Sequence, residues 1–133
     1  MSIRDALKSL GGKPRNAAAA AAPDACILLG GIEDLDAALA SRDKLMVLVY
    51  ASWCPYSQAF LPEYLAQAAA GDPCYARLVA EDDDPVVRRY DVEVFPTVLF
   101  FENGRLARRL DGVFHRGLTR GQLQDFARAC RVR

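Results

Sequence analysis

One cysteine of this chain stands where its sulfur could act as a nucleophile. Cys54 lies in the segment Trp53-Cys54-Pro55-Tyr56-Ser57, after the nearly all-apolar run Leu45–Ala51 and before a helix-compatible segment that starts at Gln58. A strand, a turn and a helix in this order place Cys54 at a helix N-terminus, where unpaired N–H groups and the helix dipole favour the thiolate. A thiolate in that position would attack an accessible disulfide and form a mixed disulfide.

Ser57 stands three residues after Cys54, where a second thiol would complete a C-x-x-C pair. Its hydroxyl is within reach of the sulfur, and we expect it to donate a hydrogen bond that supports the thiolate. A hydroxyl is far too weakly acidic to attack a mixed disulfide in place of a thiol. The sequence therefore predicts disulfide exchange through one thiol, with an external thiol completing each turnover.

Alternating strands and helices are predicted from Asp24 onward. Buried strands are expected where apolar runs end at turn residues, and helices where apolar residues recur every three to four positions. The predicted strands are Cys26–Leu29, Leu45–Ala51, Tyr75–Ala80, Thr97–Phe101 and Leu106–Asp111, and the predicted helices are Asp34–Ser41, Gln58–Ala70, Val86–Tyr90 and Thr119–Val132. The early strands, joined through helices, should be parallel, and the last two, joined at Asn103-Gly104, should form an antiparallel hairpin.

From about Ala25 to the C-terminus, the chain resembles the thioredoxin family. The segment around Cys54 resembles the family's active-site turn, with a Pro-Tyr dipeptide more typical of glutaredoxins. The other matching features are Pro62, where thioredoxins have a helix-kinking proline, Val94-Phe95-Pro96-Thr97, which resembles the cis-proline segment, Phe100–Arg105, which resembles the hairpin, and Gly112, which resembles the glycine after the last strand. The resemblance implies an α/β thioredoxin fold, with a central mixed five-stranded sheet in the order 1-3-2-4-5 and helices on both faces.

The resemblance also implies roles for individual residues. Cys54 is the expected nucleophile and Ser57 its support, so these two form the predicted catalytic set. The predicted substrate-binding residues are Trp53, Pro55, Tyr56, Phe95, Pro96 and Gly112. Pro96 is expected to be cis and to lie beside Cys54, where the neighbouring backbone would pair with a bound peptide.

Two positions depart from the family pattern, and three further cysteines are expected far from Cys54. Leu48 stands where thioredoxins keep a buried aspartate that accepts a proton from the resolving thiol, and Tyr50 stands where they have a tryptophan. By the implied topology, Cys26 and Cys74 lie near the starts of their strands and Cys130 near the end of the last helix, all remote from Cys54. We expect buried free thiols there. A disulfide between Cys26 and Cys74 is an alternative that we do not expect.

Relative to thioredoxins, the segment Val113–Gly117 looks like an insertion of about four residues between the last strand and the last helix. It should lie beside the active site, and it holds the only histidine, His115, with Arg116 inside it and Arg120 shortly after it. One interpretation is a rim that selects an acidic or glutathione-like partner. The alternative is a solvated loop.

Composition limits the classes of partner. The 133 residues fit one domain, predicted at 24–133, after a tail or linker at 1–23 that includes a possible short helix. Lys plus Arg and Asp plus Glu number 17 each, so neither nucleic acid nor an acidic membrane is expected as a partner. We expect no membrane span, no secretory signal, no cofactor and no metal; the acidic turn Glu81–Asp84 is interpreted as solvated. A monomeric cytoplasmic protein is the expectation.

The leading hypothesis is a thioredoxin-like oxidoreductase that exchanges protein or glutathione disulfides through Cys54, with glutathione or a thioredoxin-reductase system as reductant. A second hypothesis is that Ser57 is a Cys→Ser trapping substitution in a C-P-Y-C oxidoreductase, although Leu48 is a departure that trapping would not need. A third is a binding module that holds partners without turnover. Iron–sulfur cluster binding, as in single-thiol glutaredoxins, is disfavoured by Trp53 and by the absence of their usual Gly-Phe after the cysteine.

Overall fold

The computed structural model describes residues 26–70 and 74–130 of the chain. The predicted tail at 1–23 and the last residues of the predicted C-terminal helix lie outside this part. Every strand and helix predicted within it is present, with ends displaced by at most three residues. The strands are β1 (Cys26–Leu29), β2 (Lys44–Tyr50), β3 (Tyr75–Val79), β4 (Thr97–Glu102) and β5 (Arg105–Leu110), and the helices are α2 (Ile32–Ser41), α3 (Pro55–Ala70), α4 (Pro85–Tyr90) and α5 (Arg120–Cys130).

The five strands form one sheet in the order β1-β3-β2-β4-β5. β3 pairs in parallel with both β1 and β2, whereas β4 is antiparallel to both β2 and β5. This topology confirms the predicted mixed sheet. It also places the C-terminal ends of β1, β2 and β3 at one edge of the molecule.

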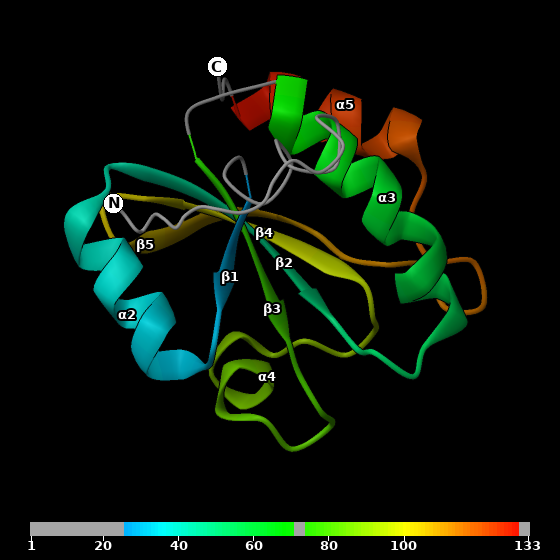
Figure 1. Cartoon of the computed structure of the whole chain (residues 1–133), viewed down its shortest axis with the longest axis horizontal. Coiled ribbons are helices and arrows are strands. Elements are labelled where there is room, and N and C mark those ends of the chain that lie inside the picture. The colour runs from blue at the N-terminus through cyan, green and yellow to red at the C-terminus, as the bar shows by residue number, and fades with distance from the viewer. Residues whose placement is uncertain (1–25, 71–73, 131–133) are drawn as a thin grey trace, which may run out of the picture.

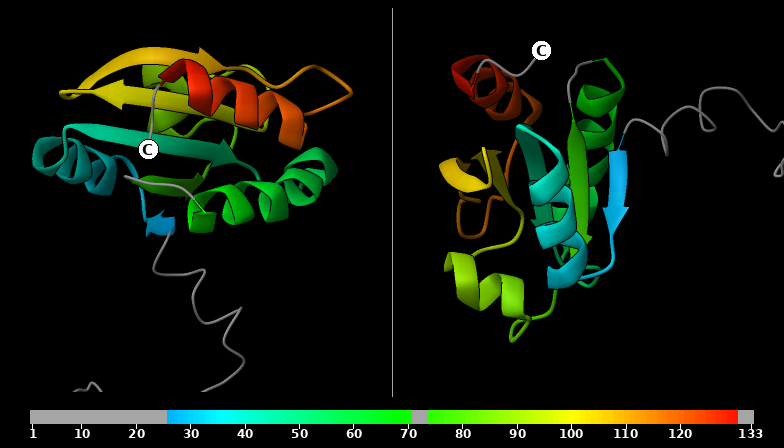
Figure 2. Two further views of the ribbon diagram at one scale, coloured as in Figure 1. Left: turned by 90° about the horizontal axis from the view of Figure 1, so that it is seen from above. Right: turned by 90° about the vertical axis from the view of Figure 1, so that its left-hand side faces the viewer.

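Helices cover both faces of the sheet, with α3 and α5 on one face and α2 and α4 on the other (Figures 1 and 2). β2 lies at the centre, and its side chains alternate between the two layers. Met46 and Leu48 join the core beneath α3 and α5, whereas Val47 and Val49 join the core beneath α2 and α4. Burial on both faces explains why this strand is apolar from Leu45 onward.

α3 begins at Pro55, three residues before the predicted start at Gln58. Proline suits the first position of a helix because its fixed φ is already helical and the N–H it lacks would have no intrahelical partner. The helix continues through Pro62 to Ala70. The kink expected at Pro62 stays a prediction.

Tyr64 fixes α3 to the sheet. Its side chain is fully buried, and its hydroxyl oxygen lies 2.8 Å from the carbonyl oxygen of Ala76 on β3 and 3.0 Å from that of Met46 on β2. Its single proton can bond either acceptor. Because α3 is held at its middle, its first turn has a fixed position at the end of β2.

Among the described residues, no helix has the length and apolar character needed to cross a membrane.

Candidate active site

Cys54 is the last residue before α3, in the turn that follows β2. Its N–H donates to the carbonyl oxygen of Ala51 at 3.2 Å, and its own carbonyl accepts from the N–H of Gln58 at 3.0 Å. The residue is only 6% exposed. The sulfur therefore sits at the positive end of the α3 dipole, as predicted, with a small opening to solvent.

The carbonyl of Phe95 accepts a hydrogen bond from the Cys54 thiol. The Sγ–H group donates to it at 3.8 Å, a long contact that sulfur allows. The peptide bond between Phe95 and Pro96 is cis, which confirms that prediction. Because the contact needs a proton on sulfur, it exists only in the thiol form of Cys54. A thiolate would have to find its support among N–H donors at the helix start or on a bound partner.

Ser57 is fully buried in the first turn of α3, but its hydroxyl has a different partner from the one expected. Its Oγ accepts a hydrogen bond from the N–H of Ala51 at 3.3 Å. No hydrogen bond between this hydroxyl and the Cys54 sulfur occurs among the described residues. The N–H of Ala51 needs an acceptor because β2 ends at Tyr50, and the Ser57 oxygen supplies it. Ser57 closes the turn that carries Cys54.

A groove of about 510 Å³ opens beside Cys54 and includes most of the predicted substrate-binding residues. Trp53 is 58% exposed and stands edge-on to the Phe95 ring, with centroids 6.2 Å apart. Pro55 and Tyr56 form the wall from the start of α3. Pro96 and Gly112 are buried and do not line this groove. They lie behind it.

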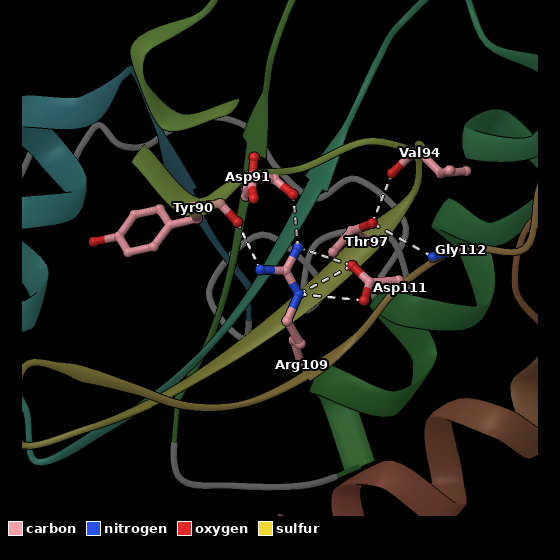
Figure 3. Close-up of polar contacts among 7 residues, drawn as sticks. All are labelled: Tyr90, Asp91, Val94, Thr97, Arg109, Asp111 and Gly112. Carbon is pink, nitrogen blue, oxygen red and sulfur yellow. Dashed lines mark hydrogen bonds and ion pairs between the residues drawn. The ribbon is translucent and has the colours of Figure 1, made fainter. Parts of the chain in front are cut away.

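The Thr97 side chain links Gly112 to the cis-proline segment through hydrogen bonds (Figure 3). The Thr97 hydroxyl donates to the carbonyl oxygen of Val94 at 2.6 Å and accepts from the N–H of Gly112 at 3.4 Å. A Cβ added to Gly112 would overlap the carbonyl oxygen of Pro96. Glycine is therefore required for close backbone approach, and its role is to position Pro96.

Arg109 is a functional candidate that the sequence did not reveal. Figure 3 shows its guanidinium directed at two backbone carbonyls and at one carboxylate. It donates to the carbonyl oxygens of Tyr90 at 2.6 Å and Asp91 at 3.1 Å, and it pairs with Asp111 at 2.8 Å. These bonds tie the end of α4 to the end of β5. They fix the segment that leads from α4 to Phe95 and Pro96.

Leu48 is fully buried in the core beneath α3, where the resemblance would place an acid. The polar side chain nearest in register is Arg77, which pairs with Leu48 across β2 and β3. Its Nη1 donates to the Tyr50 hydroxyl at 2.9 Å, and its Nε is buried without a hydrogen-bond partner in the described part of the chain. This position therefore offers no proton acceptor for a resolving thiol.

The other described cysteines are free thiols at the far end of the sheet or at a helix end. Burial raises the pKa of Cys26 to about 11, against the opposing effect of Arg77, and burial likewise raises the pKa of Cys130 to about 11. Cys74 is half-buried and accepts a hydrogen bond from Arg42 at 3.1 Å. Cys26 and Cys74 lie at the starts of β1 and β3, the ends opposite the β2–α3 turn. This placement agrees with the expectation that neither resolves a disulfide on Cys54.

The loop Val113–Gly117 is ordered by its own backbone. Val113 and Gly117 exchange two hydrogen bonds, of 3.0 and 2.7 Å, and form an isolated antiparallel bridge. Phe114 and His115 line the groove, which confirms the predicted place of the loop. Arg120 does not line the groove and pairs with Glu63 at 3.4 Å. Within the described ranges, no group of three or more His, Cys, Asp or Glu side chains could hold a metal ion.

Comparisons with known proteins agree with this geometry. The thioredoxin family model matches residues 32–128. Over 71 residues, the chain is 42% identical to protein disulfide isomerase-like 1-4 of Oryza sativa subsp. japonica, which covers 50% of this chain and 13% of the relative. It is 34% identical over 74 residues to the protein disulfide-isomerase of Oryctolagus cuniculus, covering 52% of this chain and 14% of that one. The aligned region thus spans about one seventh of these relatives.

Solved structures show the same fold. A mutant thioredoxin from Halobacterium salinarum NRC-1 superposes with a TM-score of 0.67 at 23% identity, covering 80% of this chain and 91% of that one. The thioredoxin of Schistosoma mansoni gives a TM-score of 0.68 at 18% identity, covering 78% and 94%.

Proposed function

The chain belongs to the thioredoxin family, and on that premise we propose that it exchanges disulfides through the single thiol of Cys54. The observation that carries the proposal is the place of that sulfur. It lies at the N-terminus of α3, faces the carbonyl of Phe95 at 3.8 Å, and opens onto a groove where an extended partner could reach it. Of the described cysteines, only Cys54 lines this groove.

The reaction has two exchange steps. In the first, the Cys54 thiolate attacks one sulfur of a partner disulfide, a new S–S bond forms, the old one breaks, and the leaving thiolate takes a proton from water. In the second, a small thiol such as glutathione attacks the mixed disulfide and releases Cys54 as a thiolate. A further thiol must be oxidised for net reduction of the partner. Each complete reduction therefore consumes two external thiols and yields their disulfide.

Two structural facts support resolution from outside. Ser57 uses its oxygen to accept the N–H of Ala51 and has no thiol to offer. Leu48 supplies no acid to accept a proton, and Cys26 and Cys130 are buried away from the groove. A mixed disulfide on Cys54 should thus persist until another thiol enters.

We further propose protein disulfides or glutathione disulfides as partners, glutathione or a thioredoxin-reductase system as the source of thiols, and a monomer in the cytoplasm as the working state. Free thiols at Cys26, Cys74 and Cys130 support a reducing compartment, because such thiols persist there. The relatives named as protein disulfide isomerases are longer, so their activity is carried to this chain only as a proposal.

The proposal is tested by trapping. The protein is mixed with a small peptide disulfide in the absence of other thiols, quenched with acid, and analysed by mass spectrometry after digestion. We expect one peptide per chain, attached at Cys54, and its release on addition of millimolar glutathione. Cys74→Ala is the matched control, because Cys74 is the most exposed of the other described cysteines, and it should trap as well as the parent. No adduct at Cys54, or release without added thiol, would contradict the proposal.

A binding module is the second candidate, and one observation favours it. Cys54 is only 6% exposed, so the groove could hold a partner without reaction. In that case Cys54→Ala and the parent protein would bind a reduced peptide with equal affinity, and neither would form an adduct with its disulfide.

A further inference from the structure

The groove beside Cys54 is acidic along the side formed by the segments that flank α4. Asp82, from the turn before α4, and Glu93, from the segment after it, both line the groove and are exposed. Neither carboxylate has a hydrogen bond or an ion pair with any described residue. Two exposed, unpaired carboxylates at the mouth of one apolar groove attract a cationic group on whatever enters it.

Aromatic side chains form a second part of the groove. Phe114 is 72% exposed and Trp53 is 58% exposed, an unusual position for two such large apolar side chains on a small domain. The loop that carries Phe114 is held in place rather than loose. Its two backbone bonds join Val113 to Gly117, and Gly117 packs so closely on Tyr56 that an added Cβ would stand 2.9 Å from the tyrosine Cβ. A preformed aromatic surface binds an apolar side chain at a low entropic cost.

No lysine or arginine side chain of the described residues lines the groove. Arg116 is exposed but does not line the groove, and Arg120 pairs with Glu63 instead. His115 is the only basic side chain among the groove residues, and its ring packs against Phe114 with centroids 3.9 Å apart. The charges that line the groove therefore favour a cationic partner over an acidic or glutathione-like one. A rim that selects an acidic or glutathione-like partner was one interpretation of the loop, with a solvated loop as the alternative, and these charges do not favour that rim.

We propose that this groove selects protein disulfides in which the reacting cysteine lies in an extended segment with a lysine or arginine beside it and an apolar side chain nearby. The proposal rests on the proposed function, since it concerns partners of Cys54. The cation lies against the carboxylates of Asp82 and Glu93, and the apolar side chain lies on Phe114 and Trp53. Attraction between these charges raises the rate at which the disulfide reaches the sulfur.

The test compares three short peptides that are identical except for the residue after their single cysteine, which is lysine, glutamine or glutamate. Each is prepared as a mixed disulfide with 2-nitro-5-thiobenzoate. Attack by Cys54 on the peptide sulfur releases the coloured thiolate, because that is the better leaving group. We expect the lysine peptide to react about three- to tenfold faster than the glutamate peptide at low ionic strength, and less than about twofold faster in about 0.5 M salt.

Variants of the groove assign the effect. The double variant Asp82→Asn with Glu93→Gln should bring the ratio of lysine to glutamate rates close to one. Asp83→Asn is the matched control, since Asp83 is exposed in the same turn but does not line the groove, and it should keep most of the ratio. Phe114→Ala should slow peptides that carry an apolar neighbour while leaving the charge ratio in place.

The outcomes separate the two proposals. If the three peptides react at equal rates, if the glutamate peptide or glutathione disulfide is preferred, or if the double variant keeps the ratio, the charge selection is wrong although Cys54 still reacts. If Cys54→Ala releases the coloured thiolate as fast as the parent protein, the proposed function itself fails.

Discussion

At position 57, the difference between a hydroxyl and a thiol decides how a mixed disulfide on Cys54 ends. The serine occupies the place from which a second thiol would attack, and it is fully buried. Its hydroxyl accepts the N–H of Ala51, a bond that a thiol would replace only weakly. Serine therefore satisfies the hydrogen bonding of the turn. It does not allow release of a bound partner, because no other described thiol lies near Cys54.

Ser57→Cys should form the same mixed disulfide with a peptide but then release the peptide without an added thiol. A thiol at position 57 can attack the mixed disulfide, form a bond with Cys54 and free the peptide. We expect the trapped adduct of the parent protein, stable without added thiol, to become short-lived in the variant, with an intramolecular disulfide in its place. Quenched samples analysed by mass spectrometry check this.

Two further results complete that experiment. Ser57→Ala also lacks a thiol at this position, so its mixed disulfide should be as stable as that of the parent. The substitution removes the oxygen that accepts the N–H of Ala51, so it should lower the unfolding free energy by about 1 kcal/mol. If the adduct on Ser57→Cys is still released only when glutathione is added, the lack of an acidic side chain at position 48, rather than the lack of a second thiol, limits release.

Single residues also show what a sequence can reveal. Cys54, Trp53 and the cis bond at Pro96 were predictable because each belongs to a local pattern that the family shares. The partner of Ser57 was not, because it depends on the unpaired N–H that remains where β2 ends. Arg109 was missed for a similar reason. An arginine in a hairpin strand has no distinctive neighbours in the chain, and its carbonyl partners on Tyr90 and Asp91 become visible only in space.

At the scale of elements, the site is a meeting of three segments held by different means. The β2–α3 turn is fixed by the buried Tyr64 of α3 and by Ser57. The cis-proline segment is fixed by Thr97 and Arg109, and the loop Val113–Gly117 by its own backbone bonds. The sequence predicted the elements themselves because their periodicities are strong, but it placed the start of α3 too late, since proline and serine resemble a turn as much as a first helical turn.

Arg109→Gln should loosen the cis-proline segment while the fold persists. The variant loses the ion pair with Asp111 and most of the bonds to the carbonyls of Tyr90 and Asp91. We expect a loss of about 1–2 kcal/mol in unfolding free energy, measured with urea, because a partly exposed charged network contributes modestly. Exchange with a peptide disulfide should slow more than alkylation of Cys54 by iodoacetamide, since only the peptide needs the segment in place.

Arg108→Gln is the matched control for that substitution. Arg108 neighbours Arg109 on β5 and is exposed, and its side chain makes no hydrogen bond or ion pair among the described residues. It should change neither stability nor exchange. If Arg109→Gln slows peptide exchange and alkylation equally, then Arg109 supports the fold in general and has no specific part in holding the cis-proline segment.

At the scale of the whole molecule, the Cys54 thiol and two buried thiols lie in different environments. Cys54 lies at the surface groove, whereas Cys26 and Cys130 lie in the core beneath α3 and α5, together with Tyr64. Burial raises the pKa of all three core groups, to about 11 for each thiol and well above the ordinary range for Tyr64. The unfolding free energy of the domain therefore depends on pH through groups that lie far from Cys54.

The sign of that dependence follows from proton binding. Unfolded thiols lose their protons near pH 9, whereas the native Cys26 and Cys130 keep theirs to about pH 11. Above about pH 9 the native state thus binds more protons, and the free energy of unfolding falls as pH rises through that window. The stability is fully present below about pH 9. Tyr64 acts in the same direction from about pH 10 upward.

Replacement of Cys26 by alanine should flatten this alkaline decline. We expect the unfolding free energy of the parent to fall between about pH 8.5 and about pH 10, with Cys26 responsible for about 1 kcal/mol of the fall. Cys26→Ala lowers stability at every pH because it leaves a small void, but its slope against pH should be shallower. Urea unfolding followed by circular dichroism at several pH values measures both quantities. Equal slopes in the two proteins would mean that Cys26 ionises in the native state as readily as in the unfolded chain, and that the core beneath α3 admits water.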